Sequence, residues 1–131
     1  MKDSDNGLER ARECSVIRVL LDGSLLLKLD DKEQAVYLHG IEIPKPPPQE
    51  YFDWFAQRLP RIRGPLRCVF RGSTETGQMK AQLFYFAWQD KSGDVWLDLA
   101  LALLSQGLAK VAPGNFPERE EYLKREKAAP E

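Results

Sequence analysis

The sequence lacks a long hydrophobic run and a dominant charge of either sign. No stretch reaches the roughly 18 apolar residues that a membrane-spanning helix needs, and the start, MKDSDNG, has no apolar signal-peptide core. We therefore expect no membrane association and a cytoplasmic protein, or an exported one whose leader has been removed. Nineteen basic and twenty acidic residues give a net charge of −1. Without a global positive field, nucleic-acid binding would need a local patch.

Cysteine and histidine are also scarce, with two cysteines and one histidine in 131 residues. Cys14 and Cys68 could pair only if the fold brought them together, and two thiols in a domain of this size are more often free and buried, so we expect no disulfide. His39 has no second histidine and no cysteine at zinc-ligand spacing, which favours a structural role. The length suits one domain with one core, which we expect to be monomeric.

A strong strand pattern is present from residue 15 onward. Two apolar runs, residues 15–21 and 24–29, flank the pair Asp22 and Gly23, which is typical of a β-hairpin. A third run covers residues 34–39. Residues 1–14 are polar and predict a flexible tail, so we place the domain at residues 15–131.

A proline-rich segment, residues 44–48, separates these strands from the second half of the chain, because prolines fit neither a helix interior nor a central strand. After it, apolar side chains at spacings of three and four predict a helix over residues 50–59. The remaining predicted elements are strands over residues 66–71 and 82–88 and helices over residues 95–104 and 118–128. The fold class is α+β: five strands, a helix inserted after the third, and C-terminal helices fit an OB-type barrel.

Four short segments occur in an order that points to one family. They are Asp22-Gly23-Ser24-Leu25, then Tyr37 before Gly40-Ile41-Glu42-Ile43-Pro44-Lys45, then Thr76-Gly77-Gln78, then Gly107-Leu108-Ala109. They resemble the staphylococcal (thermonuclease-like, SNase-like) nuclease family, whose segments read Asp-Gly-Asp-Thr, Gly-Ile-Asp-Ala-Pro-Glu, Tyr-Gly-Arg and Gly-Leu-Ala. The resemblance spans roughly residues 16–128 and implies the SNase-like form of the OB-type barrel.

The resemblance also implies a reaction: phosphodiester hydrolysis with one calcium ion held by acidic side chains, a glutamate near the attacking water, and two arginines on the transition state. At the matching positions, Ser24 is a weak neutral ligand, and a protonated Lys45 cannot act as the base. Tyr37 lacks the forked donors of an arginine. The second arginine position aligns with either Gln78 or Lys80. We therefore expect no catalytic residues and no cofactor.

Two carboxylates survive at the family's site. Asp22 and Glu42 are weak candidates for a residual calcium site, although an Asp-Gly pair is also a turn in its own right. Our main hypothesis is a pseudoenzyme that binds single-stranded nucleic acid or a protein. The alternative is a weak or atypical metal-dependent nuclease on DNA or RNA, using Asp22 and Glu42 for the metal and Lys80 in place of an arginine.

Two further features have a functional and a structural interpretation. Pro46, Pro47 and Pro48 can form a preformed extended segment that a partner's aromatic groove recognises, or can merely stiffen the connection to the helix. The aromatic residues of the last predicted strand and its neighbour could stack bases, although packing in the core is the simpler interpretation. They are Phe84, Tyr85, Phe86, Trp88 and Trp96.

Overall fold

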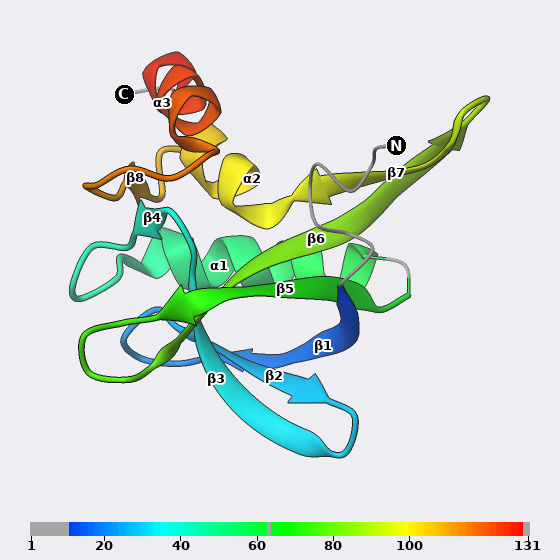
Figure 1. The fold of residues 1–131 in the computed structure, drawn as a ribbon, viewed down its shortest axis with the longest axis horizontal. Coiled ribbons are helices and arrows are strands. Elements are labelled where there is room, and N and C mark those ends of the chain that lie inside the picture. Colours follow the sequence, from blue (N-terminus) through cyan, green and yellow to red (C-terminus); the bar gives the residue numbers. More distant parts are fainter. Residues whose placement is uncertain (1–10, 63, 130–131) are drawn as a thin grey trace.

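The computed structural model describes residues 11–62 and 64–129, and its strands form a six-stranded sheet in the order β3-β2-β1-β5-β6-β7. A parallel pairing between β3 and β6 joins five of these strands into a ring (Figure 1). This α+β ring is consistent with the predicted OB-type barrel. The strands are β1 (Arg12–Val19), β2 (Leu25–Leu29), β3 (Lys32–Leu38), β5 (Leu66–Ser73), β6 (Met79–Asp90) and β7 (Gly93–Asp98).

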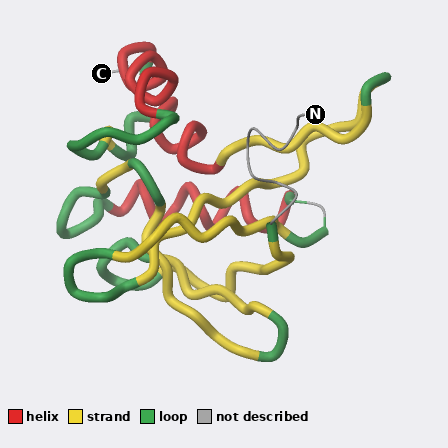
Figure 2. Tube along the Cα trace, viewed as in Figure 1, coloured by secondary structure: helices red, strands yellow, loops and turns green. Residues whose placement is uncertain are grey.

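The helices follow the predicted order. α1 (Gln49–Arg58) continues into the short 3₁₀ helix η3 (Leu59–Arg61) between β3 and β5, and α2 (Leu99–Ser105) and α3 (Arg119–Ala128) follow the sheet. Figure 2 shows α3 at one end of the molecule, above α2 and far from the hairpin of β2 and β3. The two-residue strands β4 (Ile41–Glu42) and β8 (Lys110–Val111) pair with one another. No helix in the described ranges is long and apolar enough to cross a membrane.

The core lies inside the ring and under α1 and α2. Alternate residues of β2 are buried because successive side chains of a strand point to opposite faces. Tyr51 and Phe55, four residues apart on α1, are almost completely buried with their rings 5.1 Å apart. From α3 only Tyr122 is fully buried. α1 therefore completes the core, whereas α3 contributes one tyrosine to it.

One predicted helix was wrong in its first half. Residues 95–98, expected to lead into a helix over residues 95–104, belong to β7, where Phe86 pairs with Trp96 and Phe84 with Asp98. Branched and aromatic side chains such as Val95 and Trp96 pack well on a pleated sheet. α2 begins only at Leu99, after Asp98 accepts a hydrogen bond from the amide of Ala100 at 2.9 Å.

The first strand also begins earlier than predicted. β1 starts at Arg12, so residues 12–14, assigned from sequence to the flexible tail, form part of the sheet, and residues 1–10 of that tail lie outside the described residues. The early start places Cys14 on β1 beside Cys68 on β5. Both are buried free thiols, as predicted. Their mutual hydrogen bond, together with burial, raises the pKa of Cys14.

The aromatic residues of β6 and β7 divide between two environments. Phe84 is buried where β6 pairs with Asp98 of β7. Farther along, Phe86 and Trp96 meet edge to face at 5.8 Å, and the guanidinium of Arg67 lies 4.3 Å from the centroid of the Trp96 ring. Trp88 is 52% exposed. Packing therefore accounts for Phe84, whereas Trp88 is exposed near the end of β6, in the β6–β7 hairpin that projects from the ring (Figure 1).

Candidate functional site

A cleft of about 710 Å³ brings together six of the seven positions at which the sequence matches the nuclease site. It lies between the turn after β1, the end of β3, β4, and the loop that joins β5 to β6. Ser24 is the seventh position; it is buried under the turn. Gln78 and Lys80, the alternatives for one family arginine, both line the cleft. The six lining positions are Asp22, Tyr37, Glu42, Lys45, Gln78 and Lys80.

The carboxylate of Asp22 is satisfied by the protein itself. One oxygen accepts hydrogen bonds from the Ser24 amide at 3.0 Å and the Ser24 hydroxyl at 2.5 Å, and the other accepts from the Tyr37 hydroxyl at 2.5 Å. Burial opposes ionisation of Asp22, but these hydrogen bonds outweigh it and lower the pKa of the carboxyl. The hydrogen bond that the Tyr37 hydroxyl donates to Asp22 raises the pKa of Tyr37. Asp22 is thus an anion whose two oxygens both accept from neighbouring side chains.

The turn that carries Asp22 is fixed from behind. Gly23 has a φ of 92°, and a side chain there would meet Ile43 Cγ2 at 3.0 Å and Pro47 Cγ at 3.3 Å. The buried hydroxyl of Tyr51 donates to the carbonyl oxygen of Gly23 at 2.5 Å. The proline segment and α1 therefore hold the turn in place. Of the three prolines predicted to bind a partner, only Pro46 is exposed, Pro47 is buried and Pro48 is half-buried.

The parallel pairing of β3 and β6 sets the middle of the cleft. It places Tyr37 opposite Lys80, and the amide of His39 donates to the carbonyl oxygen of Ala81 at 2.9 Å. Gln78 precedes β6 in a loop that is closed on itself, because its amide donates to Thr74 Oγ1 at 3.0 Å and its carbonyl accepts from the Thr74 amide at 2.7 Å. Two strands distant in sequence thus fix Tyr37 beside Lys80.

The opposite wall comes from the segment after α2, which the sequence did not assign to the site. Ala112 lines the cleft, and its amide donates to the carbonyl oxygen of Gly40 at 2.9 Å. Behind Gly40, a side chain would lie 2.7 Å from the Tyr122 ring and 2.9 Å from the Phe116 ring. The Gly-Leu-Ala segment that directly precedes β8 is the sequence feature that could have indicated this return of the chain.

His39, predicted to be structural, connects β3 to the C-terminal segment. Its Nε2 lies 3.0 Å from Glu118 Oε1, and its ring meets Phe116 edge to face at 5.3 Å. These contacts hold the imidazole against the segment that precedes α3. His39 does not line the cleft.

The side chains that line the cleft do not supply the oxygen ligands of the calcium site that the resemblance implies. Calcium takes six to eight oxygen ligands. The oxygens of Asp22 already accept three hydrogen bonds, Glu42 is exposed, and the lysines Lys45 and Lys80 line the same cleft. Within residues 11–62 and 64–129, no group of three or more acidic, histidine or cysteine side chains is arranged to hold a metal. The arrangement can instead offer ammonium, hydroxyl and amide donors to an anion.

No protein-family model and no curated protein matches this chain. The resemblance to the nuclease family therefore rests on the short sequence segments alone.

Proposed function

We propose that this chain is a catalytically degenerate SNase-like domain of the OB type that binds single-stranded nucleic acid at the cleft and does not hydrolyse it. One observation carries the proposal: Asp22 is held by Ser24 and Tyr37 inside a cleft that Lys45 and Lys80 also line. The groups of the family's site lie together, but their hydrogen bonds and charges suit binding rather than turnover.

Hydrolysis would need a base and a charge-stabilising clamp in this cleft. Position 45 has a lysine where the family has the glutamate base, and the ammonium group of a lysine donates hydrogen bonds but has no acceptor for a proton of water. The hydroxyl of Tyr37 already donates its hydrogen bond to Asp22. Neither position supplies the planar, permanently charged fork that an arginine offers to phosphate oxygens. The protein-based steps of the family's reaction are therefore missing.

Binding needs less than hydrolysis. Lys45 and Lys80 can each meet a phosphate as a point charge, and Gln78 and the threonines of the β5–β6 loop add neutral polar groups. Because Asp22, Glu42 and Glu75 line the same cleft, we expect weak affinity and a shallow salt dependence. Each phosphate contact contributes a slope of about 0.7 in a plot of log affinity against log salt concentration for a single strand.

The test compares two double variants that each remove two lysines. Lys45→Ala with Lys80→Ala should weaken binding of a labelled single-stranded oligonucleotide about tenfold and reduce the salt slope by about one to one and a half. Lys28→Ala with Lys91→Ala, which removes two exposed lysines outside the cleft, should leave both quantities nearly unchanged. Equal losses in the two variants would mean that binding is not located in the cleft.

A weak metal-dependent nuclease is the second candidate, because Asp22 and Glu42 line one cleft with Lys80. Introducing Ser24→Asp, Tyr37→Arg and Lys45→Glu together would restore the family's charges. Calcium-dependent cleavage by this triple variant, with none by the unmodified chain, would support a degenerate nuclease site. Cleavage by the unmodified chain that Glu42→Gln abolishes would favour the second candidate instead. A protein partner at the proline segment has less support, because Pro47 and Tyr51 are buried.

A further inference from the structure

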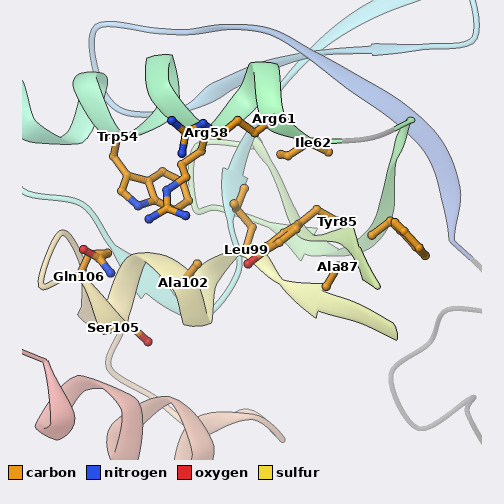
Figure 3. A pocket seen from close by; sticks show the side chains of 11 residues that line it. Trp54, Arg58, Arg61, Ile62, Tyr85, Ala87, Leu99, Ala102, Ser105 and Gln106 are labelled. Carbon is orange, nitrogen blue, oxygen red and sulfur yellow. The ribbon is translucent and has the colours of Figure 1, made fainter. Parts of the chain in front are cut away.

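A second hollow, separate from the cleft, lies where α1 and η3 face α2 and β6. Its volume is about 400 Å³, within the range of small-molecule sites, and none of its lining residues lines the cleft. Figure 3 shows Trp54, Arg58 and Arg61 entering from α1 and η3, and Ser105 lying on α2 across from them. Tyr85 enters from β6.

The hollow is positively charged. Arg58 and Arg61 line it one helical turn apart, and no carboxylate does among the described residues. Within the same residues, neither guanidinium forms an ion pair. A third arginine, Arg125 of α3, donates to Ser105 Oγ at 3.3 Å. Burial raises the pKa of Tyr85; the charges of Arg58 and Arg125 act in the opposite direction, whereas the charge of the buried Asp98 adds to the increase.

Three of the polar side chains that line the hollow, Trp54, Arg58 and Arg61, can only donate hydrogen bonds. The indole N–H of Trp54 is buried and has no hydrogen-bond partner in residues 11–62 and 64–129. An indole and a guanidinium can donate but not accept. Ser105 already donates to the Leu101 carbonyl oxygen at 2.9 Å. Because buried donors are nearly always paired, the unpartnered N–H next to Arg58 calls for an acceptor from outside the described residues.

The remaining surface is flat and apolar. The Trp54 ring lies beneath the guanidinium of Arg58, whose Cζ is 5.7 Å from the ring centroid, and Leu99 and Ala102 line the side of α2. A ring or short hydrocarbon could cover this surface while a charged group at its end met the arginines. Apolar walls with a few convergent polar groups are the usual composition of a ligand site.

We propose that this hollow binds a small organic anion, with its charged group on Arg58 and Arg61 and its flat apolar body against Trp54 and Tyr85. A carboxylate and a phosphate ester share this chemistry, since both accept hydrogen bonds from a guanidinium fork. The site is independent of the nucleic-acid cleft, and its failure would leave the proposed function unchanged.

The test follows the three tryptophan indole N–H resonances by nitrogen–proton correlation spectroscopy during titration with benzoate, phenyl phosphate or uncharged benzamide. We expect a saturable shift of the Trp54 resonance with at least one anion, with Trp88 and Trp96 as internal references and no saturable shift with benzamide. A stronger response to phenyl phosphate identifies phosphate esters as the ligand class, and a stronger response to benzoate identifies carboxylates. Absence of a saturable Trp54 shift with both anions up to about 10 mM, or an equal response to benzamide, would overturn the proposal.

Two variants locate the binding. Arg58→Gln with Arg61→Gln should weaken the anion at least about tenfold, because both charge-assisted hydrogen bonds are lost. Arg18→Gln with Lys91→Gln removes two charges at exposed positions outside the hollow and should leave the affinity unchanged. Trp54→Phe keeps a ring but removes the donor, and observation of the ligand's own resonances should show weaker binding. Unchanged affinity in the double arginine variant would refute the assigned site.

Discussion

The cleft and the hollow differ in whether their polar groups already have hydrogen-bond partners within the protein. In the cleft, the acidic group that a catalytic site would need free, Asp22, accepts every hydrogen bond that Ser24 and Tyr37 can offer. In the hollow, the buried indole N–H of Trp54 has no hydrogen-bond acceptor among the described residues, and the exposed guanidinium of Arg58 forms no ion pair with them. A polar group that is hydrogen-bonded within the protein stabilises the fold, whereas a donor without an acceptor can still form its hydrogen bond with a ligand. The cleft is therefore identified as a candidate site by a resemblance to a catalytic family, whereas the hollow is identified by donors that lack an acceptor.

Asp98 supports both recesses, so its replacement should have the largest effect. It is buried and accepts hydrogen bonds from Gln82 at 2.9 Å and from Tyr122 at 2.5 Å, besides capping α2. Asp98→Ala leaves these buried donors unpaired, and we expect a loss of about 3–5 kcal/mol of unfolding free energy in chemical denaturation. Asp98→Asn, which retains an oxygen for the α2 cap, should lose clearly less. Equal losses would mean that the charge and the second acceptor oxygen, which asparagine lacks, supply the stabilisation, and that the α2 cap contributes little.

Gly40→Ala should damage the cleft and spare the hollow. Its side chain would meet the Tyr122 ring at 2.7 Å and the Phe116 ring at 2.9 Å, at a φ of 81°. Overpacking and the left-handed backbone together should cost about 2–4 kcal/mol. Gly77→Ala is the matched control: its φ is 85° with no neighbouring atom within 4 Å. Thermal unfolding should show only about 1 kcal/mol lost there, and similar losses at both positions would contradict the packing argument.

The internal satisfaction of Asp22 predicts a pH dependence. Its pKa in the folded protein lies below the ordinary value of 3.8, so its stabilising contribution is present above that value and is lost as the pH falls through the folded-state pKa. Unfolding free energies of the natural chain and Asp22→Asn should therefore differ more at pH 7 than at pH 2.5. The same comparison in a Tyr37→Phe background should give a smaller difference, because one of the hydrogen bonds is already absent. A difference independent of pH would show that Asp22 is not held as described.

The smallest effect is expected in the hollow. Arg61→Gln removes an exposed charge without an ion pair within the described residues, so the unfolding free energy should change by less than about 0.5 kcal/mol. A loss above about 1 kcal/mol in denaturant would mean that the guanidinium already has a partner in the folded chain, and that the contrast with the cleft is wrong.

Local signals predicted most of the fold. The Asp22–Gly23 turn, the apolar spacing of α1 and the polar loop before β6 each specify a short-range conformation. They failed at residues 95–98, because an apolar run of strand and helix formers is ambiguous until the pairing with β6 decides it. The strand start at Arg12 was missed for the same reason: polar residues enter the sheet through pairing with β5.

The candidate site was predicted only in part. The family motif indicated which residues meet in the cleft, including both alternatives, Gln78 and Lys80. It could not indicate that Tyr37 would donate to Asp22, since that contact depends on how the chain brings β3 to the turn after β1. Nothing in the sequence indicated the hollow, because Trp54 and Arg58 on α1 fit an ordinary amphipathic helix. Unpaired donors become visible only in three dimensions.

The central claim is that the cleft binds nucleic acid without hydrolysing it. Its most direct test is a time course of fluorescence anisotropy with a labelled single-stranded oligonucleotide, at low salt and with excess calcium. We expect a rise in anisotropy that stays constant with time and is reversed by added salt. A fall below the value of the free oligonucleotide would show cleavage and contradict the claim of a degenerate site, and a flat trace would contradict the claim of binding.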